Sequence, residues 1–357
     1  MKKHIALFLA LLMALSMLAG CTKEPAATPD PDPAPAPAPA PDPAPAPAPT
    51  PDPAPAPAPA EPAVTVRLAG LKGPTTIGMV KLLDDAENKK TAQEYTFQMA
   101  AAADQVAPLL LKGELDILSA PANLAAKLYN NSKGAVKMLA VNTLGVVYIV
   151  DTGDSVTDIK SLKGKTIYAT GKNTTPEYAL RYLLQQHGLD PDKDVTLEFK
   201  SEPTEVVAQL KKSGGVAMLP QPFVTVAQGQ VTGLRVALDL TAEWDALGGD
   251  SRLVTACLMV RSKFAEEYPN AVATFLGEYA ASTKFVNENV EEAAKLVEKF
   301  DIVKAAVAQK AIPKCNIVCI TGADMKTIAS GYLQTLFEAN ATAIGDAMPG
   351  DDFYYGA

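Results

Sequence analysis

The chain has 357 residues, of which 48% are hydrophobic and 20% are charged, and its formal net charge is −8. Without Lys2 and Lys3, which precede an apolar leader, 30 basic and 40 acidic residues remain, a net charge of −10. This acidic balance argues against nucleic acid as a partner, because binding to a phosphate backbone depends on clustered Lys and Arg. It does not restrict a small ligand, since a local site can oppose the overall sign.

The first twenty residues have the pattern of a secretory signal peptide. A basic start at residues 1–4 is followed by an apolar run at 5–17, too short for an ordinary spanning helix, and then by Leu-Ala-Gly-Cys. These four residues resemble the bacterial lipoprotein processing site, which implies that Cys21 becomes a lipidated N-terminus. Two acyl chains suffice for stable anchoring. The alternative is a plain secreted protein in which Cys21 is incidental.

Residues 21–63 are rich in Pro and Ala and are not expected to fold. PDPAPAPAPA begins at residues 31 and 51, and PDPAPAPAPT begins at residue 41. Pro at every second position removes backbone donors and fixes φ, so the segment favours extended polyproline II. At about 3.1 Å per residue it reaches on the order of 120 Å. We interpret it as a stalk between a membrane and the folded part; a generic linker or a ligand for proline-binding modules are the alternatives.

Cysteine and histidine are scarce in the rest of the chain. Cys257, Cys315 and Cys319 allow at most one intramolecular disulfide, and a spacing of four between the last two is not that of a zinc site. The only histidines are His4 and His187. We therefore expect no metal and no cofactor, and we expect small buried thiols. A Cys315–Cys319 disulfide is the less favoured alternative.

The remaining residues, 64–357, predict an α/β fold in two lobes. Their number is large for one core and natural for two. Short, mostly apolar strand patterns alternate with helical ones, as in parallel sheets buried on both faces. The predicted strands are TVRLAG, YTFQMAA, LDILSA, VKMLAVNT, TIYATG, VTLEFKS, VAMLPQ and RVALDL. One helix end is well marked, because Gly188 follows His187 where a left-handed residue is needed and Pro191 prevents continuation.

An internal repeat supports the two lobes. VRLAGLKGPTTIGMVKLL begins at Val66 and TIYATGKNTTPEYALRYLL at Thr166. LDILSAPANLA likewise parallels VAMLPQPFVTVA, with 46 positions from Thr75 to Pro121 and 47 from Thr175 to Pro222. A looser third pair is VKMLAVNTLG and LRVALDLTAEW. Each lobe thus repeats the same order of strands and helices.

The chain is expected to cross between the lobes twice, near 142–151 and near 251–261. SRLVTACLMVR is a long apolar run with β-branched residues, and the chain beyond it is mostly helical to about residue 343. We expect these helices to return to the first lobe. The predicted boundaries are 64–145 plus 256–357 for the first lobe and 146–255 for the second.

A ligand site is predicted in the cleft between the lobes. In open α/β sheets ligands bind beyond the carboxyl ends of the strands, where helix starts present unpaired N–H groups and positive dipole ends. Glycines allow close backbone approach, prolines tolerate the first helical turn, and short polar side chains supply hydrogen bonds. The predicted ligand-binding residues are Gly73, Pro74, Thr75, Thr76, Pro121, Ala122, Asn123, Asn142, Thr143, Asn173, Thr174, Thr175, Gln221, Pro222, Phe223 and Trp244.

Each of these residues also has an ordinary structural interpretation. Thr and Asn at helix starts serve as N-caps, and aromatic residues such as Phe223 and Trp244 are more often core than stacking platforms. Lys72 and Lys172, beside the two glycines, are either complements to an anion or solvated surface residues.

No catalytic set is evident. His187 lies in the last turn of a helix, where the dipole favours it. Ser119 has no evident partner, and Asp84 and Asp85 lie well along a helix as part of a solvated face. We therefore predict that the protein is not an enzyme.

These segments together resemble a known family. The chain from about Val64 to Asn340 is similar to ABC-transporter solute-binding lipoproteins of the nitrate/sulfonate/taurine and thiamine-precursor type, which have the periplasmic-binding-protein type II fold. The resemblance rests on GPTTIGMVKLL, GELDILSAPANLA, SVTDIKSLKGKTIYATGKNTTPEYALRYLLQQHGLDPDKDVTLEF, VAMLPQPFVTVA and EYPNAVATFLGEYAASTKFVNENVEEAAKLV. It implies hinge closure around a small solute and delivery to a membrane permease. No arginine or other signature identifies the solute as sulfonate, nitrate or pyrimidine.

The sequence therefore predicts a monomeric receptor, lipid-anchored at Cys21 on the outer face of the cell membrane, that captures a small polar or anionic organic solute for an ABC importer. A surface adhesin or scaffold displayed on the stalk is the alternative. A second, weaker one is an enzyme similar to a thiamine-pyrimidine synthase that consumes its own His, although the mature chain has a single His at a helix end.

Overall fold

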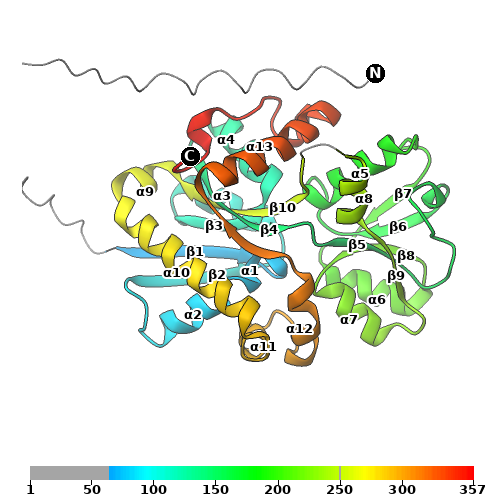
Figure 1. Ribbon diagram of the computed structural model, residues 1–357, viewed down its shortest axis with the longest axis horizontal. Coiled ribbons are helices and arrows are strands. Elements are labelled where there is room, and N and C mark those ends of the chain that lie inside the picture. The colour runs from blue at the N-terminus through cyan, green and yellow to red at the C-terminus, as the bar shows by residue number, and fades with distance from the viewer. Residues whose placement is uncertain (1–63, 249–250) are drawn as a thin grey trace, which may run out of the picture. The chain divides into compact units, whose positions relative to one another are not determined.

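A computed structural model describes residues 64–248 and 251–357, which contain two β-sheets with helices packed against them (Figure 1). The signal peptide predicted at 1–20, the lipidated Cys21 and the stalk to residue 63 lie outside the described residues. No helix within the described ranges is both long and apolar enough to cross a membrane.

The first lobe is built on a six-stranded sheet in the order β11-β4-β10-β3-β1-β2. β1 is parallel to β2 and β3, whereas β10 runs antiparallel between β3 and β4, and β11 pairs antiparallel with β4. The strands are β1 Thr65–Leu71, β2 Glu94–Ala100, β3 Ile117–Pro121, β4 Val136–Leu144, β10 Val254–Arg261 and β11 Ile317–Ile320. Every residue of β3 is buried, as expected for a strand covered by helices on both faces.

The second lobe is built on a five-stranded sheet in the order β7-β6-β8-β5-β9. β6 is parallel to β7 and β8, and β5 runs antiparallel between β8 and β9. The strands are β5 Val147–Asp151, β6 Thr166–Ala169, β7 Thr196–Phe199, β8 Val216–Pro220 and β9 Arg235–Asp239.

The two sheets share one topology. The series β2-β1-β3-β10-β4 and β7-β6-β8-β5-β9 match position by position, each with one antiparallel strand inserted fourth. The repeat seen in the sequence therefore corresponds to two lobes wound in the same way, and the predicted α/β class is confirmed. In both sheets the inserted strand comes from the part of the chain that has just crossed over from the other lobe.

Helices connect the strands and continue beyond the last crossing. In the first lobe they are α1 Pro74–Ile77, α2 Val80–Glu87, α3 Ala107–Lys112 and α4 Ala122–Ser132, with the 3-10 turn η1 Ala103–Gln105. In the second they are α5 Thr175–Gln186, α6 Pro203–Ser213, α7 Phe223–Gln230 and α8 Leu240–Ala246, with η2 Lys160–Leu162. After β10 come α9 Ser262–Glu267, α10 Pro269–Glu288, α11 Val290–Lys299, α12 Ala305–Ala311, η3 Ile312–Lys314, α13 Gly322–Ala339, η4 Ala341–Ala343 and η5 Asp351–Phe353.

The C-terminal helices pack mainly on the first lobe, as the sequence predicted. α10 packs against α2, where the Ser282 hydroxyl donates to the Gly78 carbonyl over 2.7 Å. α13 packs on β4 and β10 and also reaches α5 and thus the second lobe. α12 contacts α7 of the second lobe. The C-terminal part of the chain therefore joins the lobes as well as completing the first one.

Three strands were missed by the sequence analysis. The run near 251–261 was interpreted as a crossing between the lobes, but Val254–Arg261 is β10, which pairs with β3 and β4 in the first sheet. The segment at 147–151 was interpreted as part of a crossing, but it is β5, a central strand of the second sheet, and the chain crosses in the short link of Gly145 and Val146. β11 interrupts a region predicted to be helical. All three are apolar runs whose assignment depends on the neighbours with which they pair, and periodicity alone does not reveal these neighbours.

The predicted end of α5 is confirmed. Gly188 has φ +79°, and the N–H groups of Gly188 and Leu189 donate to the carbonyls of Gln185 and Leu184, both over 2.9 Å. Leu189 is buried behind the turn. His187 lies at the end of the helix with Nδ1 2.8 Å from the Leu183 carbonyl, so it belongs to the helix terminus.

The three cysteines of the folded part are free thiols. Cys257 and Cys315 are buried, and burial raises the pKa of Cys315 to about 12 and that of Cys319 to about 11. The structure contains no Cys315–Cys319 disulfide. The thiols therefore remain protonated at neutral pH and act as small packing groups.

Candidate functional site

Four helices begin directly after the strands β1, β3, β6 and β8, at the carboxyl edges of the two sheets. They are α1, α4, α5 and α7, and the residues before them are Gly73, Pro121, Thr174 and Pro222. None of these four residues caps its helix with a side-chain hydrogen bond. Three of them are Gly or Pro and have no side chain that can cap, and the hydroxyl of Thr174 donates to the Gly171 carbonyl instead. At α7 the Gln221 side chain accepts from the Thr225 N–H over 3.4 Å, so capping by a side chain, the alternative interpretation, applies there.

In the first lobe the predicted residues form a connected polar floor. The carbonyl of Thr75 accepts from the Ser119 hydroxyl over 2.6 Å and from Nδ2 of Asn142 over 3.3 Å. Asn142 also donates to Ser119 over 2.7 Å, and the hydroxyl of Thr143 donates to Oδ1 of Asn142 over 3.2 Å. The hydroxyls of Thr75 and Thr76 both donate to the Leu71 carbonyl. Strands β3 and β4 thus hold the start of α1 in one position.

Ser119 was considered in the sequence analysis only as a nucleophile, for which no partner was evident. In the structure it has a different role, because it links the start of α1 to β4. Its neighbour in space, Asn142, lies 23 positions away in the chain. No local pattern could have revealed this contact, because it depends on the register of β3, β10 and β4.

In the second lobe the polar groups are mostly engaged locally. The hydroxyl of Thr174 donates to the Gly171 carbonyl over 2.6 Å, and that of Thr225 donates to Oε1 of Gln221 over 2.8 Å. Asn173 has φ +59°, and its N–H donates to the Glu177 carboxylate over 2.6 Å. The Gln221–Pro222 peptide bond is cis.

Glu177 was not predicted as part of this region. It is buried in the first turn of α5, and besides the Asn173 N–H it accepts a hydrogen bond from Nε of Arg181 over 2.7 Å. A sequence signal existed, since Thr174 and Glu177 have the spacing of a capping box. The carboxylate instead fixes the left-handed Asn173, and Arg181 balances its charge.

The helix starts of the two lobes meet in pairs. Asn123 on α4 donates from Nδ2 to the Asn173 carbonyl over 3.4 Å, and Thr175 on α5 donates to Oδ1 of Asn123 over 3.3 Å. At the start of α1, a Cβ atom on Gly73 would lie 3.7 Å from Cε2 of Phe223 on α7. α4 thus faces α5, and α1 faces α7. The lobes are closed on each other in this structure.

Most of the predicted residues are buried in the structure. Those with little or no exposed surface are Gly73, Pro74, Thr75, Thr76, Pro121, Ala122, Asn123, Asn142, Thr143, Thr175, Gln221, Pro222, Phe223 and Trp244. Thr174 is half-buried and Asn173 is exposed. Buried polar side chains must find partners, and most of these find them within their own lobe, while Asn123 and Thr175 bond across the two lobes.

Trp244 lies apart from the four helix starts. It packs between Tyr182 of α5 and Tyr332 of α13, with ring centroids 4.7 and 5.7 Å away, and its indole N–H donates to the Ser251 carbonyl over 3.2 Å. It therefore has the surroundings of a core residue that joins α8 to α5 and α13, rather than those of an open stacking platform.

The region carries no free charge among its buried residues. Lys72 pairs with the exposed Asp301 over 3.2 Å, and Lys172 is exposed. Neutral amides, hydroxyls and helix dipoles are therefore the groups that face one another. Such groups stabilise negative charge or accept and donate hydrogen bonds to a polar solute. No group of three or more His, Cys, Asp or Glu side chains suitable for a metal occurs among the described residues.

Two lobes of this topology, closed on each other through helix starts at the carboxyl edges of their sheets, define the periplasmic-binding-protein type II fold. The model of the NMT1-like family matches residues 76–299, and the chain belongs to that family. No curated protein matches the sequence.

Solved structures are similar over most of the folded part. An ABC transporter protein from Parabacteroides distasonis is 23% identical, with a TM-score of 0.66 over 81% of this chain and 98% of its own. The periplasmic aliphatic sulphonate binding protein SsuA from Escherichia coli is 17% identical, with a TM-score of 0.64 over 82% and 96%. The periplasmic nitrate-binding protein NrtA from Synechocystis PCC 6803 is 15% identical, with a TM-score of 0.55 over 69% of each chain. At these identities the likeness concerns the fold.

Proposed function

We propose that the protein is an extracytoplasmic solute-binding receptor of an ABC importer. One observation carries the proposal: helix starts from two lobes meet through neutral, buried polar residues. The proteins of similar fold described above include an aliphatic sulphonate binding protein and a nitrate-binding protein. A small polar or anionic organic solute is the ligand class that such groups suit, because amide N–H groups bind oxygen-rich anions without a formal positive charge.

Closure would supply both affinity and selectivity. With the lobes apart, the helix starts are open to water; with the lobes together, the solute replaces the contacts between Asn123, Asn173 and Thr175. These contacts of 3.3 and 3.4 Å are at the long end of the hydrogen-bond range, so their exchange for solute contacts costs little. Exclusion of water then strengthens each remaining hydrogen bond.

The parts outside the described residues complete the proposal. Cys21 would hold the protein on the outer face of the cell membrane, and the Pro/Ala segment would give the lobes reach toward a permease, which is the proposed protein partner. The lobes would comprise residues 64–145 plus 256–357 and residues 146–255, and the receptor would act as a monomer. Neither a catalytic role nor a nucleic acid partner is part of the proposal.

The test is a binding measurement on purified protein with the lobes intact. Native mass spectrometry of the protein as purified identifies any solute carried over from the cell, and calorimetry then measures its affinity. Truncation of Thr75 and Thr174 to Ala together is expected to weaken binding without unfolding the protein. Unchanged affinity in the double variant would count against the site, and the absence of any bound or binding solute would count against the function.

A further inference from the structure

One buried hydroxyl next to the helix starts has no partner. Tyr332 lies on α13 with no exposed surface, and its hydroxyl makes no hydrogen bond. Its ring packs against Trp244 of the second lobe, and its hydroxyl lies near Thr175 at the start of α5. The side chain therefore extends from a helix that packs on the first sheet to the place where α4 and α5 meet.

A buried hydroxyl without a partner is costly. Leaving such a group unpaired costs about 1–3 kcal/mol, and native proteins seldom retain one without a reason. Burial raises the pKa of Tyr332, so the phenol stays protonated and can both donate and accept. The surrounding groups are already engaged, since Asn123 bonds to Thr175 and also donates to the Ala343 carbonyl over 3.0 Å.

A second unpartnered hydroxyl lies at the same edge of the first sheet. Thr255 on β10 is buried and has no hydrogen-bond partner. It precedes Ala256, which is paired with Pro121 at the end of β3 and with Thr143 on β4. Thr255 thus lies one position before the residue that pairs with Pro121, which directly precedes α4.

We infer that the Tyr332 hydroxyl is a hydrogen-bonding contact for the solute that binds between α4 and α5. This assignment rests on the proposed function and adds to it a third element, the C-terminal helix α13, which lies outside the internal repeat. When the lobes separate, α5 moves away from Tyr332 and the hydroxyl becomes accessible. When they close on a solute, the hydroxyl finds the partner that the protein itself does not provide.

The test compares two matched variants. Tyr332→Phe removes only the hydroxyl and keeps the ring beside Trp244. Tyr354→Phe serves as the control. The hydroxyl of Tyr354 is also buried and unpartnered, but Tyr354 lies on the C-terminal segment, where its ring packs on Phe353. Both variants and the wild-type chain are titrated with ethanesulfonate, MOPS and nitrate as probes. The readouts are calorimetry and the fluorescence of Trp244, the only tryptophan of the chain.

A ligand-free measurement accompanies the titrations. If the hydroxyl has no partner in the protein, Tyr332→Phe leaves the urea midpoint of ligand-free protein unchanged or raises it, as does Tyr354→Phe. A clear fall of the midpoint in Tyr332→Phe alone would show that the hydroxyl has a structural partner and would overturn the assignment.

In the titrations, Tyr332→Phe is expected to bind about 3- to 10-fold more weakly, the loss of one hydrogen bond, whereas Tyr354→Phe binds like the wild type. Equal affinity of Tyr332→Phe and wild type would overturn the role of Tyr332 and leave the receptor function standing. An equal loss of affinity in Tyr332→Phe and Tyr354→Phe would also overturn the role of Tyr332. A wild-type chain that binds none of the probes would overturn the proposed solute class and with it this assignment.

Discussion

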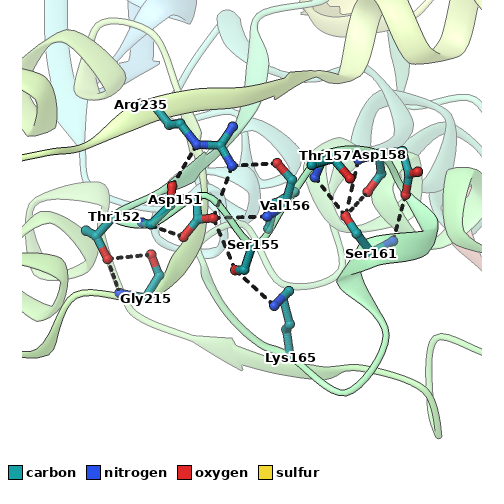
Figure 2. A network of polar contacts seen from close by, with 11 residues as sticks. Asp151, Thr152, Ser155, Val156, Thr157, Asp158, Ser161, Lys165, Gly215 and Arg235 are labelled. Atoms are coloured by element: carbon teal, nitrogen blue, oxygen red, sulfur yellow. Dashed lines mark hydrogen bonds and ion pairs between the residues drawn. The ribbon is translucent and has the colours of Figure 1, made fainter.

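Each lobe fastens its central strands with one buried aspartate, but the two lobes do so differently. In the first lobe Asp116, 1% exposed, precedes β3 and accepts three hydrogen bonds from Arg67 on β1, two from the guanidinium at 2.8 and 2.7 Å and one from the backbone at 3.0 Å. Arg261 at the end of β10 adds a fourth at 3.0 Å. In the second lobe Asp151, 3% exposed, ends β5 and bonds mainly to the loop that follows it (Figure 2).

The bonds of Asp151 are shared between backbone and side chains. The N–H groups of Gly153 and Val156 donate over 3.0 and 3.1 Å, and the Ser155 hydroxyl over 3.3 Å. Arg235 on β9 donates to the carboxylate over 3.3 Å, and more closely to the carbonyls of Gly153 and Val156, over 2.7 and 2.6 Å (Figure 2).

The difference follows from how the chain builds each sheet. Asp116 joins Arg67 on β1 to Arg261 on β10, and Arg261 follows the whole second lobe in the chain. Charge-assisted bonds between side chains can connect such distant segments. The second sheet is made from one continuous stretch, so a carboxylate that organises its own loop is sufficient. The first lobe therefore depends more on its aspartate than the second does.

The sharpest test of this comparison is Asp116→Ala. It removes the shared partner of two guanidinium groups. Breaking a buried ion pair costs about 3–5 kcal/mol, and the lower end, about 3 kcal/mol, is expected here because Arg67 is partly exposed and can turn to water. The free energy of unfolding, measured with urea, should fall by that amount. Asp116→Asn, which keeps the shape and loses the charge, should fall less. A loss below about 1 kcal/mol for Asp116→Ala would contradict the proposed fastening role.

The matching change in the second lobe, Asp151→Ala, should cost less, about 2 kcal/mol. Arg235 keeps its two carbonyl partners when the Asp151 carboxylate is lost, whereas Asp116→Ala removes the shared carboxylate partner of two guanidinium groups. The same urea measurement applies. If Asp151→Ala destabilises the protein as much as Asp116→Ala, the two lobes are fastened equally and the comparison fails.

Acid should remove the stabilisation that Asp116 and Asp151 contribute. Burial alone would raise the pKa of Asp116, but the hydrogen bonds from Arg67 and Arg261 outweigh it and lower the pKa. Burial alone would also raise the pKa of Asp151, but the hydrogen bonds from the N–H groups of Gly153 and Val156 outweigh it and lower the pKa. A lowered folded-state pKa stabilises the protein above the unfolded-state pKa of about 3.9, and this stabilisation is lost as pH falls toward the folded-state value.

The measurement is the urea midpoint of unfolding as a function of pH. It compares the wild type with the double variant that carries Asp116→Asn and Asp151→Asn. The difference between the two proteins should be constant above about pH 5 and shrink below about pH 4. A difference that is unchanged down to pH 3 would mean that these carboxylates are not the acid-sensitive groups.

The smallest effect is expected where the lobes touch. Thr175→Val removes the hydroxyl that donates to Asn123 over 3.3 Å and should lower the free energy of unfolding by about 0.5 kcal/mol, because the bond is long. Urea unfolding followed by Trp244 fluorescence measures it. A loss as large as that of Asp151→Ala would show that the contact between the lobes is as important as the fastening within each lobe.

Much of the candidate site could be predicted because its signals are local. The Gly-Pro-Thr-Thr and Asn-Thr-Thr-Pro segments mark helix starts after strands through the conformations that Gly and Pro permit, and Gly188 marks a helix end for the same reason. Repetition of these signals at nearly equal spacing was enough to predict two lobes. The resemblance to the family rested on the same segments.

The rest depends on contacts between residues far apart in the chain. The segment 147–151 is a strand only because β8 and β9 pair with it, and Ser119 has partners only because β3 and β4 bring Thr75 and Asn142 beside it. Trp244 meets Tyr332 across 88 positions, and the role inferred for Tyr332 rests on that packing. Local propensity and spacing thus determined which elements form and in what order. Only the tertiary structure decided which of their side chains meet, because burial and hydrogen bonding are settled between neighbours in space.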